Sequence, residues 1–134
     1  MALNELYAVW TPRVISVLRI MTGLLFLQHG TAKYLGIPAM PNFTNVQVMS
    51  LSGIAGLIEL VAGVLLTVGL FTRPVAFICS GMTAVAYFIA HAPRGFYPLA
   101  NGGELAVLYC FVFLFLAVAG AGLWSADAML RDKQ

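Results

Sequence analysis

Four long apolar segments, separated by short turn-forming stretches, organise the 134-residue chain. A membrane-spanning helix needs about 20 mostly apolar residues, and each segment comes close to that length. Glycine and proline mark the connections, where a helix cannot continue. The pattern predicts an all-α fold, an integral membrane four-helix bundle that forms a single domain over residues 1–134. The predicted spans are approximately Pro12–Ala32, Leu51–Phe71, Pro74–Ala92 and Glu104–Trp124.

Small and polar residues follow one face of each of the first two spans. In the second span the series with steps of four, three and four is Ser52, Gly56, Glu59 and Gly63. In the first span the same steps give Arg19, Gly23, Phe26, Gly30 and Lys33. Small residues at this spacing let helix backbones approach closely in lipid. The stripes therefore place Arg19 and Glu59 on packing faces of the bundle.

Arg19 and Glu59 are ionisable residues at membrane depth. An unpaired charge there costs roughly 2.5–3.5 kcal/mol on insertion scales. A long arginine side chain spans the difference in depth between them, so we expect an intramembrane Arg19–Glu59 pair. Two uses of the pair stay open and are compatible: a buried ion pair that sets helix register, or a contact with a proton, a substrate or a quinone carbonyl.

The outward ends of the spans carry further polar residues. Those in the loop 91–104 either only cap the return of the chain into the membrane or join the others in a candidate ligand-binding cluster around one mouth of the bundle. Its members are His29, Lys33, Tyr87, His91, Arg94, Asn101 and Glu104. A single interfacial histidine is explained by hydrogen bonding alone, but histidine titrates near neutral pH and suits proton handling beside a quinone. No H-x-x-H or E-x-x-H spacing supports a metal site, so none is predicted.

Aromatic residues inside the spans could line an apolar slot for a quinone or a lipid, although core packing and lipid contact are the simpler explanation. These residues are Phe26, Tyr87, Phe88, Tyr109, Phe111, Phe113 and Phe115.

Composition supports the membrane assignment and excludes other classes. The chain is 61% apolar and 9% charged, with a mean hydropathy of +0.94. A net charge of +2 without a basic patch gives no indication of nucleic-acid binding. Four of the basic residues lie on the side of the termini and two on the other side, which predicts cytoplasmic termini. The two cysteines, Cys79 and Cys110, are expected at different depths, as buried small side chains without a disulfide.

Three motifs resemble those of the DoxX family of small bacterial membrane proteins. They are R-x9-H-G-x2-K (Arg19–Lys33), E-x3-G-x5-G-L-x-T-R (Glu59–Arg73) and H-x-P-x-G-F-x-P-x2-N-G-G-E (His91–Glu104). The resemblance covers most of the chain, to about Asp127. It implies a four-helix protein of the bacterial inner membrane, in a family described as oxidoreductase components that includes a subunit of a thiosulfate:quinone oxidoreductase.

The resemblance leads to two functional hypotheses. The first is an accessory membrane subunit of a quinone-linked redox system, with a protein partner or a homo-oligomer in the membrane. The second is a non-catalytic scaffold or assembly subunit, or a small-solute transporter. No C-x-x-C and no flavin or nicotinamide motif is present, so any electrons would come from a partner or from a quinone. The cofactor, the reaction and the catalytic residues stay open.

Overall fold

The protein is an all-helical membrane bundle, as the sequence predicts. The computed structural model describes residues 2–133, among which no strand occurs. Three helices are long and apolar enough to cross a membrane, and a fourth apolar helix is shorter. In chain order the helical segments are α1 (Leu3–Leu35), a 3-10 turn (Pro41–Phe43), α2 (Leu51–Val68), α3 (Thr72–Ala86), a π-helical turn (Tyr87–His91), a 3-10 turn (Ala92–Arg94), α4 (Pro98–Asn101), α5 (Glu104–Ala119) and α6 (Ala126–Arg131).

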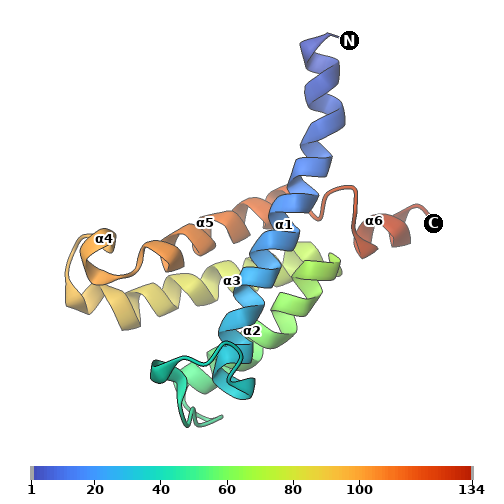
Figure 1. The fold of residues 1–134 in the computed structure, drawn as a ribbon. Coiled ribbons are helices and arrows are strands. Elements are labelled where there is room, and N and C mark those ends of the chain that lie inside the picture. The colour runs from blue at the N-terminus through green and yellow to red at the C-terminus, as the bar shows by residue number, and fades with distance from the viewer. Residues whose placement is uncertain (1, 134) are drawn as a thin grey trace.

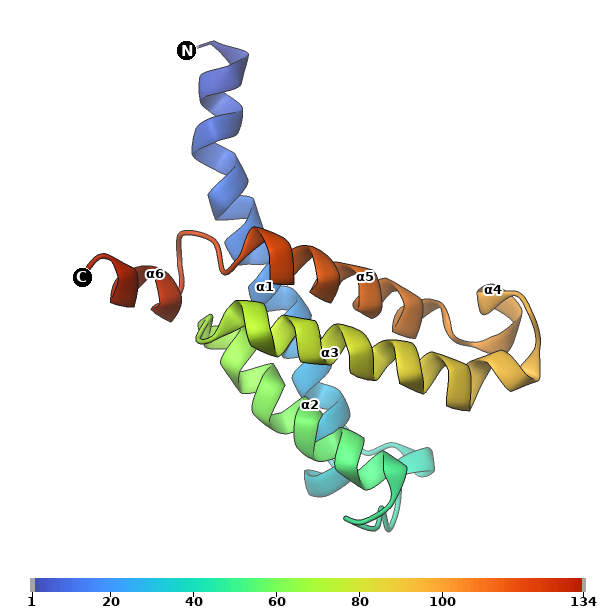
Figure 2. The same ribbon diagram turned by 180° about the vertical axis from the view of Figure 1, so that it is seen from behind.

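The four long helices form two hairpins that cross each other. Helix α1 packs along α2, and α3 packs along α5. The hairpins diverge away from the crossing, so the loop between α1 and α2 lies well apart from the loop between α3 and α5 (Figures 1 and 2). Both termini leave the bundle at the opposite end from these loops (Figure 1).

The core lies where the hairpins cross. Phe26 of α1 stands edge-on against two rings of α5, with ring centroids 4.8 Å from Phe113 and 5.4 Å from Tyr109. Edge-to-face pairs at this separation are favourable beyond the apolar area that they bury. The other buried core residues are Ala62, Leu66, Ala76, Cys79 and Leu116.

Helix α1 is longer than the span predicted for it. It begins at Leu3 and passes through Pro12, where the sequence predicts its start. Its 33 residues correspond to about 50 Å, whereas the hydrocarbon core of a bilayer is about 30 Å thick. The turns before Pro12 are largely exposed and project beyond the other helices (Figure 1). The carbonyl of Pro12 accepts a hydrogen bond from the amide of Leu123 (3.1 Å), which joins α1 to the segment after α5.

Helix α5 is shorter than the fourth predicted span. It ends at Ala119, not near Trp124, because Gly120 adopts a φ of +89° that is unfavourable for residues with a side chain. Its 16 residues rise about 24 Å, less than the thickness of the hydrocarbon core. The segment from 120 to 125 therefore runs back toward α1 as irregular backbone before α6 begins.

Close backbone contact between α1 and α2 confirms the predicted small-residue stripes. A Cβ atom on Gly63 would lie 2.7 Å from the Cα atom of Leu27. A Cβ atom on Gly30 would lie 2.8 Å from the backbone nitrogen of Leu60. Both distances are too short for real atoms, so these positions of the hairpin require glycine.

We therefore expect Gly63→Ala to lower the free energy of unfolding by about 1–3 kcal/mol, because the added methyl group forces the two backbones apart. Gly81→Ala is the matched control, since a Cβ atom there meets nothing within 4 Å. It should leave stability unchanged or raise it by up to about 1 kcal/mol. Thermal unfolding in lipid nanodiscs measures both variants. Equal stability of the two variants would contradict the close contact.

Candidate ligand-binding site

Arg19 is fully buried and binds backbone carbonyls. Its Nη1 donates to the carbonyls of Leu66 (2.5 Å) and Thr67 (2.7 Å), in the last turn of α2. Its Nε donates to Ala121 (2.8 Å) and its Nη2 to Trp124 (2.5 Å). We call these five residues the junction. The last carbonyls of a helix have no partner within the helix, and an arginine has five donors to offer them.

The expected Arg19–Glu59 pair is not formed, and side-chain direction explains why. Side chains in a helix lean toward its N-terminus. Because α1 and α2 are antiparallel, Arg19 leans toward the end of α2 while Glu59 leans toward its start. Arg19 accordingly reaches Leu66 and Thr67, seven and eight residues after Glu59. The depths of the two Cα positions alone therefore do not show which groups meet.

Glu59 pairs instead with Lys33, a residue that the sequence analysis placed in the outer cluster. The Nζ atom of Lys33 donates to both carboxylate oxygens, at 3.0 and 2.9 Å. Each side chain is only 8% exposed. Phe43, from the loop between α1 and α2, covers the pair, with its ring centroid 5.5 Å from Nζ. The spacing of Gly30 and Lys33 on one stripe, facing the Glu59 stripe, was the signal in the sequence for this pair.

A cavity of about 260 Å³ lies near this ion pair, between α1, α5 and the loop that joins α1 to α2. Its lining is mostly apolar, with polar groups from Gln28, His29 and Tyr109. The full lining is Leu25, Gln28, His29, Ala32, Pro38, Met40, Phe43, Leu105 and Tyr109. Three of these residues, Ala32, Met40 and Phe43, also line an adjoining cavity that includes Lys33.

The imidazole of His29 and the ring of Tyr109 stand edge to face across the cavity wall, with centroids 6.0 Å apart. Tyr109 is stacked on Phe113 (5.5 Å, 9° between planes), which holds its ring in place. Among residues 2–133, neither the His29 imidazole nor the Tyr109 hydroxyl has a hydrogen-bond partner. Both groups are therefore free to bind a polar group that enters the cavity.

The remaining members of the predicted cluster lie in a separate group, in the loop between α3 and α5. Asn101 is buried and holds this loop together. Its Nδ2 donates to the hydroxyl of Tyr87 (3.1 Å) and the carbonyl of Gly95 (2.9 Å), and its Oδ1 accepts from the amide of Gly103 (2.8 Å). The imidazole of His91 is stacked on the ring of Tyr87, and its Nδ1 atom lies 3.3 Å from the carbonyl oxygen of Asn101. The hydrogen bonds of these side chains are thus made within the loop and hold its backbone together.

The single mouth expected for the bundle is therefore divided. His29 and Lys33 lie at the loop between α1 and α2, and His91 lies at the loop between α3 and α5, which the crossing of the hairpins keeps apart (Figures 1 and 2). Arg94 and Glu104 are exposed and belong to neither hydrogen-bond network. Within the described chain, no three His, Cys, Asp or Glu side chains are placed to hold a metal ion.

A small membrane helical bundle with buried charges is the class that this architecture defines. The sequence model of the DoxX family matches residues 14–92. A protein of Haemophilus influenzae, described as uncharacterized, is 44% identical over 92% of this chain and 96% of its own length. An uncharacterized membrane protein of Mycobacterium tuberculosis is 28% identical over 96% of this chain and 87% of its own. No solved structure matches the chain.

The chain therefore belongs to the DoxX family. The matched stretch contains Arg19, His29, Lys33 and Glu59. Tyr109, the second free polar group of the cavity, lies outside it, so family membership alone does not identify this cavity.

The Lys33–Glu59 pair can be tested by a double-mutant cycle. Lys33→Met and Glu59→Leu should each lower the free energy of unfolding by about 3–5 kcal/mol, because each leaves one buried charge without its partner. The double variant should recover much of that loss, since an apolar pair replaces the ion pair. Glu104→Gln, which removes an exposed carboxylate, is the control and should change stability little. Losses that simply add in the double variant would contradict the pairing.

Proposed function

We propose that this protein is a membrane subunit of a quinone-linked redox system and that it binds the quinone headgroup in the cavity beside His29 and Tyr109. The observation that carries the proposal is the presence of two polar groups without a hydrogen-bond partner, among residues 2–133, on the wall of an otherwise apolar cavity. A quinone ring is apolar on both faces and has carbonyl oxygens at its edge, and it accepts hydrogen bonds from such donors.

The size and position of the cavity support this ligand. Ligand pockets usually enclose about 300–1,000 Å³, and this one, at about 260 Å³, suits a single-ring headgroup better than a whole lipid-like molecule. Most of the lining residues are apolar, which suits the faces of the ring and the start of an isoprenoid tail. Pro38, Met40 and Phe43 of the loop line one side of the cavity.

The neighbouring ion pair gives the site its electrostatic character. Lys33 and Glu59 hold a buried positive and a buried negative charge close together, near His29. An imidazole beside such a pair can supply a proton to a reduced quinone oxygen. Full reduction of a quinone takes two electrons and two protons. In this proposal a redox partner protein supplies both electrons, and both protons come from water at the membrane surface, with His29 protonated there and passing each proton in turn to a quinone oxygen.

In the same proposal the protein lies in the bacterial inner membrane with both termini in the cytoplasm. Four basic residues lie at the junction end of the bundle, which supports that orientation. They are Arg13, Arg73, Arg131 and Lys133. The quinone cavity then lies near the outer surface. Exposed apolar side chains along α1 to α5 leave room for a partner subunit or a second copy beside the surrounding lipid.

Two variants test quinone binding directly. His29→Leu and Tyr109→Phe should each weaken binding of a short-chain ubiquinone about tenfold, because each removes one hydrogen bond to a buried carbonyl. Binding is measured by titration of the purified protein in nanodiscs, with thermal unfolding as the check on folding.

His91→Leu is the matched control, since His91 lies outside the cavity and already contacts the loop. It should bind the quinone as the unmodified protein does. Unchanged binding in the His29 and Tyr109 variants, or no binding by the unmodified protein, would contradict the proposal and favour a scaffold or a transporter.

A further inference from the structure

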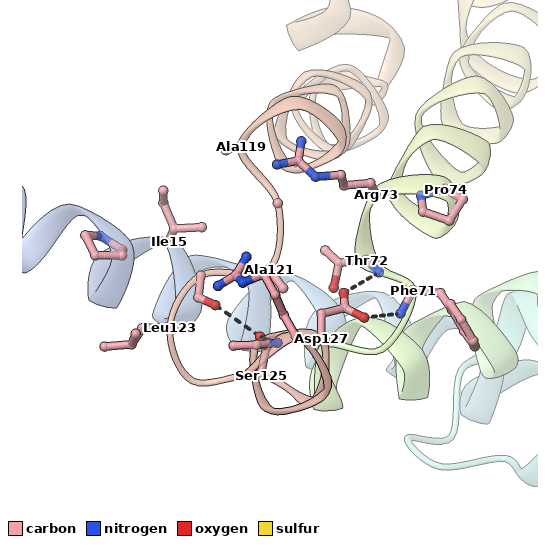
Figure 3. A pocket seen from close by; sticks show the side chains of 15 residues that line it. Ile15, Phe71, Thr72, Arg73, Pro74, Ala119, Ala121, Leu123, Ser125 and Asp127 are labelled. Atoms are coloured by element: carbon pink, nitrogen blue, oxygen red, sulfur yellow. Dashed lines mark hydrogen bonds between the residues drawn. The ribbon is translucent and has the colours of Figure 1, made fainter. Parts of the chain in front are cut away.

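A second cavity, of about 450 Å³, lies at the junction end of the bundle, far from the quinone cavity (Figure 3). The start of α3, the end of α5 and the segment leading into α6 form its walls. Two arginines from different elements line it, Arg73 and Arg131, together with the carboxylate of Asp127.

The guanidinium of Arg73 is held in a fixed position with donors to spare. Its Nη1 donates to the carbonyls of Ala117 (3.2 Å) and Val118, at the end of α5. The group lies over Gly120, where a Cβ atom would come within 3.1 Å of Nη2. Among residues 2–133, the Nη2 and Nε atoms of Arg73 have no acceptor. One side of the guanidinium therefore holds the helix end while the other donors remain available.

The carboxylate of Asp127 forms no ion pair with either of these arginines among residues 2–133. Its two oxygens accept hydrogen bonds from the amides of Phe71 (2.8 Å) and Thr72 (2.9 Å), at the start of α3, as Figure 3 shows. An N-terminal amide pair offsets the charge of a carboxylate. Arg131 forms no ion pair within the described residues. The hydroxyl of Thr72, also on the cavity wall, is buried without a partner in the same part of the chain.

The depth of the cavity points to the membrane surface. Helix α5 ends and helix α3 begins at its rim. Pro12 and Leu123 line the cavity, and the exposed Trp10 and Trp124 lie within two residues of them. Tryptophan gathers at the boundary between hydrocarbon and headgroups. A ligand held here lies at the level of lipid phosphates, and exposed apolar side chains such as Val14 and Phe77 lead from there toward the hydrocarbon.

We propose that this cavity binds the phosphate group of an anionic phospholipid through Arg73 and Arg131. Guanidinium donors match the geometry of phosphate oxygens, and basic pockets between helix ends suit such headgroups. The lipid would join α3, α5 and α6 at the junction, independently of the quinone cavity.

Thermal unfolding in nanodiscs of stated composition tests the proposal. Phosphatidylglycerol mixed into phosphatidylcholine should raise the melting temperature of the unmodified protein above its value in phosphatidylcholine alone. Arg131→Gln should remove most of this rise and weaken phosphatidylglycerol binding about five- to tenfold. Arg73→Gln should do the same. Arg131 lacks a structural partner, so its variant stays informative even if Arg73→Gln unfolds.

Two matched controls remove the same charge elsewhere. Arg13 lies at the junction end but outside the cavity, and Arg94 lies on the loop between α3 and α5. Arg13→Gln and Arg94→Gln should keep the rise. An equal loss in Arg13→Gln would show diffuse attraction to a charged surface and overturn the proposal. The same rise in melting temperature from inorganic phosphate in detergent would assign the cavity to a free anion. No rise with phosphatidylglycerol would mean that the cavity is not an anion site. Either result would overturn the proposal.

Discussion

Buried backbone carbonyls need hydrogen-bond donors, and the structure depends on how Arg19 supplies them. Its guanidinium donates to the carbonyls at the end of α2 and in the segment after α5. Helix α2 ends at Val68 and α5 ends at Ala119, and both ends lie beside α1. Without Arg19, the carbonyls of Leu66, Thr67, Ala121 and Trp124 would be left without these hydrogen bonds, at a cost of roughly 1–3 kcal/mol for each one that stays buried. One fully buried guanidinium binds all four carbonyls. It thereby fastens α1 to the end of α2 and to the segment that follows α5.

Because Arg19 binds carbonyls at the junction, Glu59 is not its partner and pairs with Lys33 instead. Lys33 and Glu59 neutralise each other at the far end of the same hairpin, beneath Phe43. The charge of each is costly alone and tolerable as a pair. Their pairing leaves His29, on the same helix as Lys33, without a structural task in the described residues, facing a cavity with Tyr109. In the proposed function, structural and binding roles are thus separated along α1.

Much of the fold could be predicted from apolar run lengths, and the glycine stripes at Gly30 and Gly63 correctly indicated the tight α1–α2 contact. The partner of Arg19 could not be predicted from depth, because side-chain lean carries Arg19 and Glu59 in opposite directions. The outer cluster was predicted as one group because apolar spacing says nothing about the angle at which two hairpins cross. That angle separates His29 from His91 and brings Tyr109 of α5 to His29 instead.

Quinone affinity of the folded Arg19→Lys variant tests this separation of roles most directly. Lysine keeps the charge but lacks the planar guanidinium that donates to several carbonyls at once. The free energy of unfolding should therefore fall by about 3 kcal/mol or more. The account predicts that the folded variant binds a short-chain ubiquinone within about twofold of the unmodified protein, since a change of 0.4 kcal/mol or less is expected at a distant site. A tenfold loss of affinity in the folded variant would contradict it and make Arg19 part of the binding site.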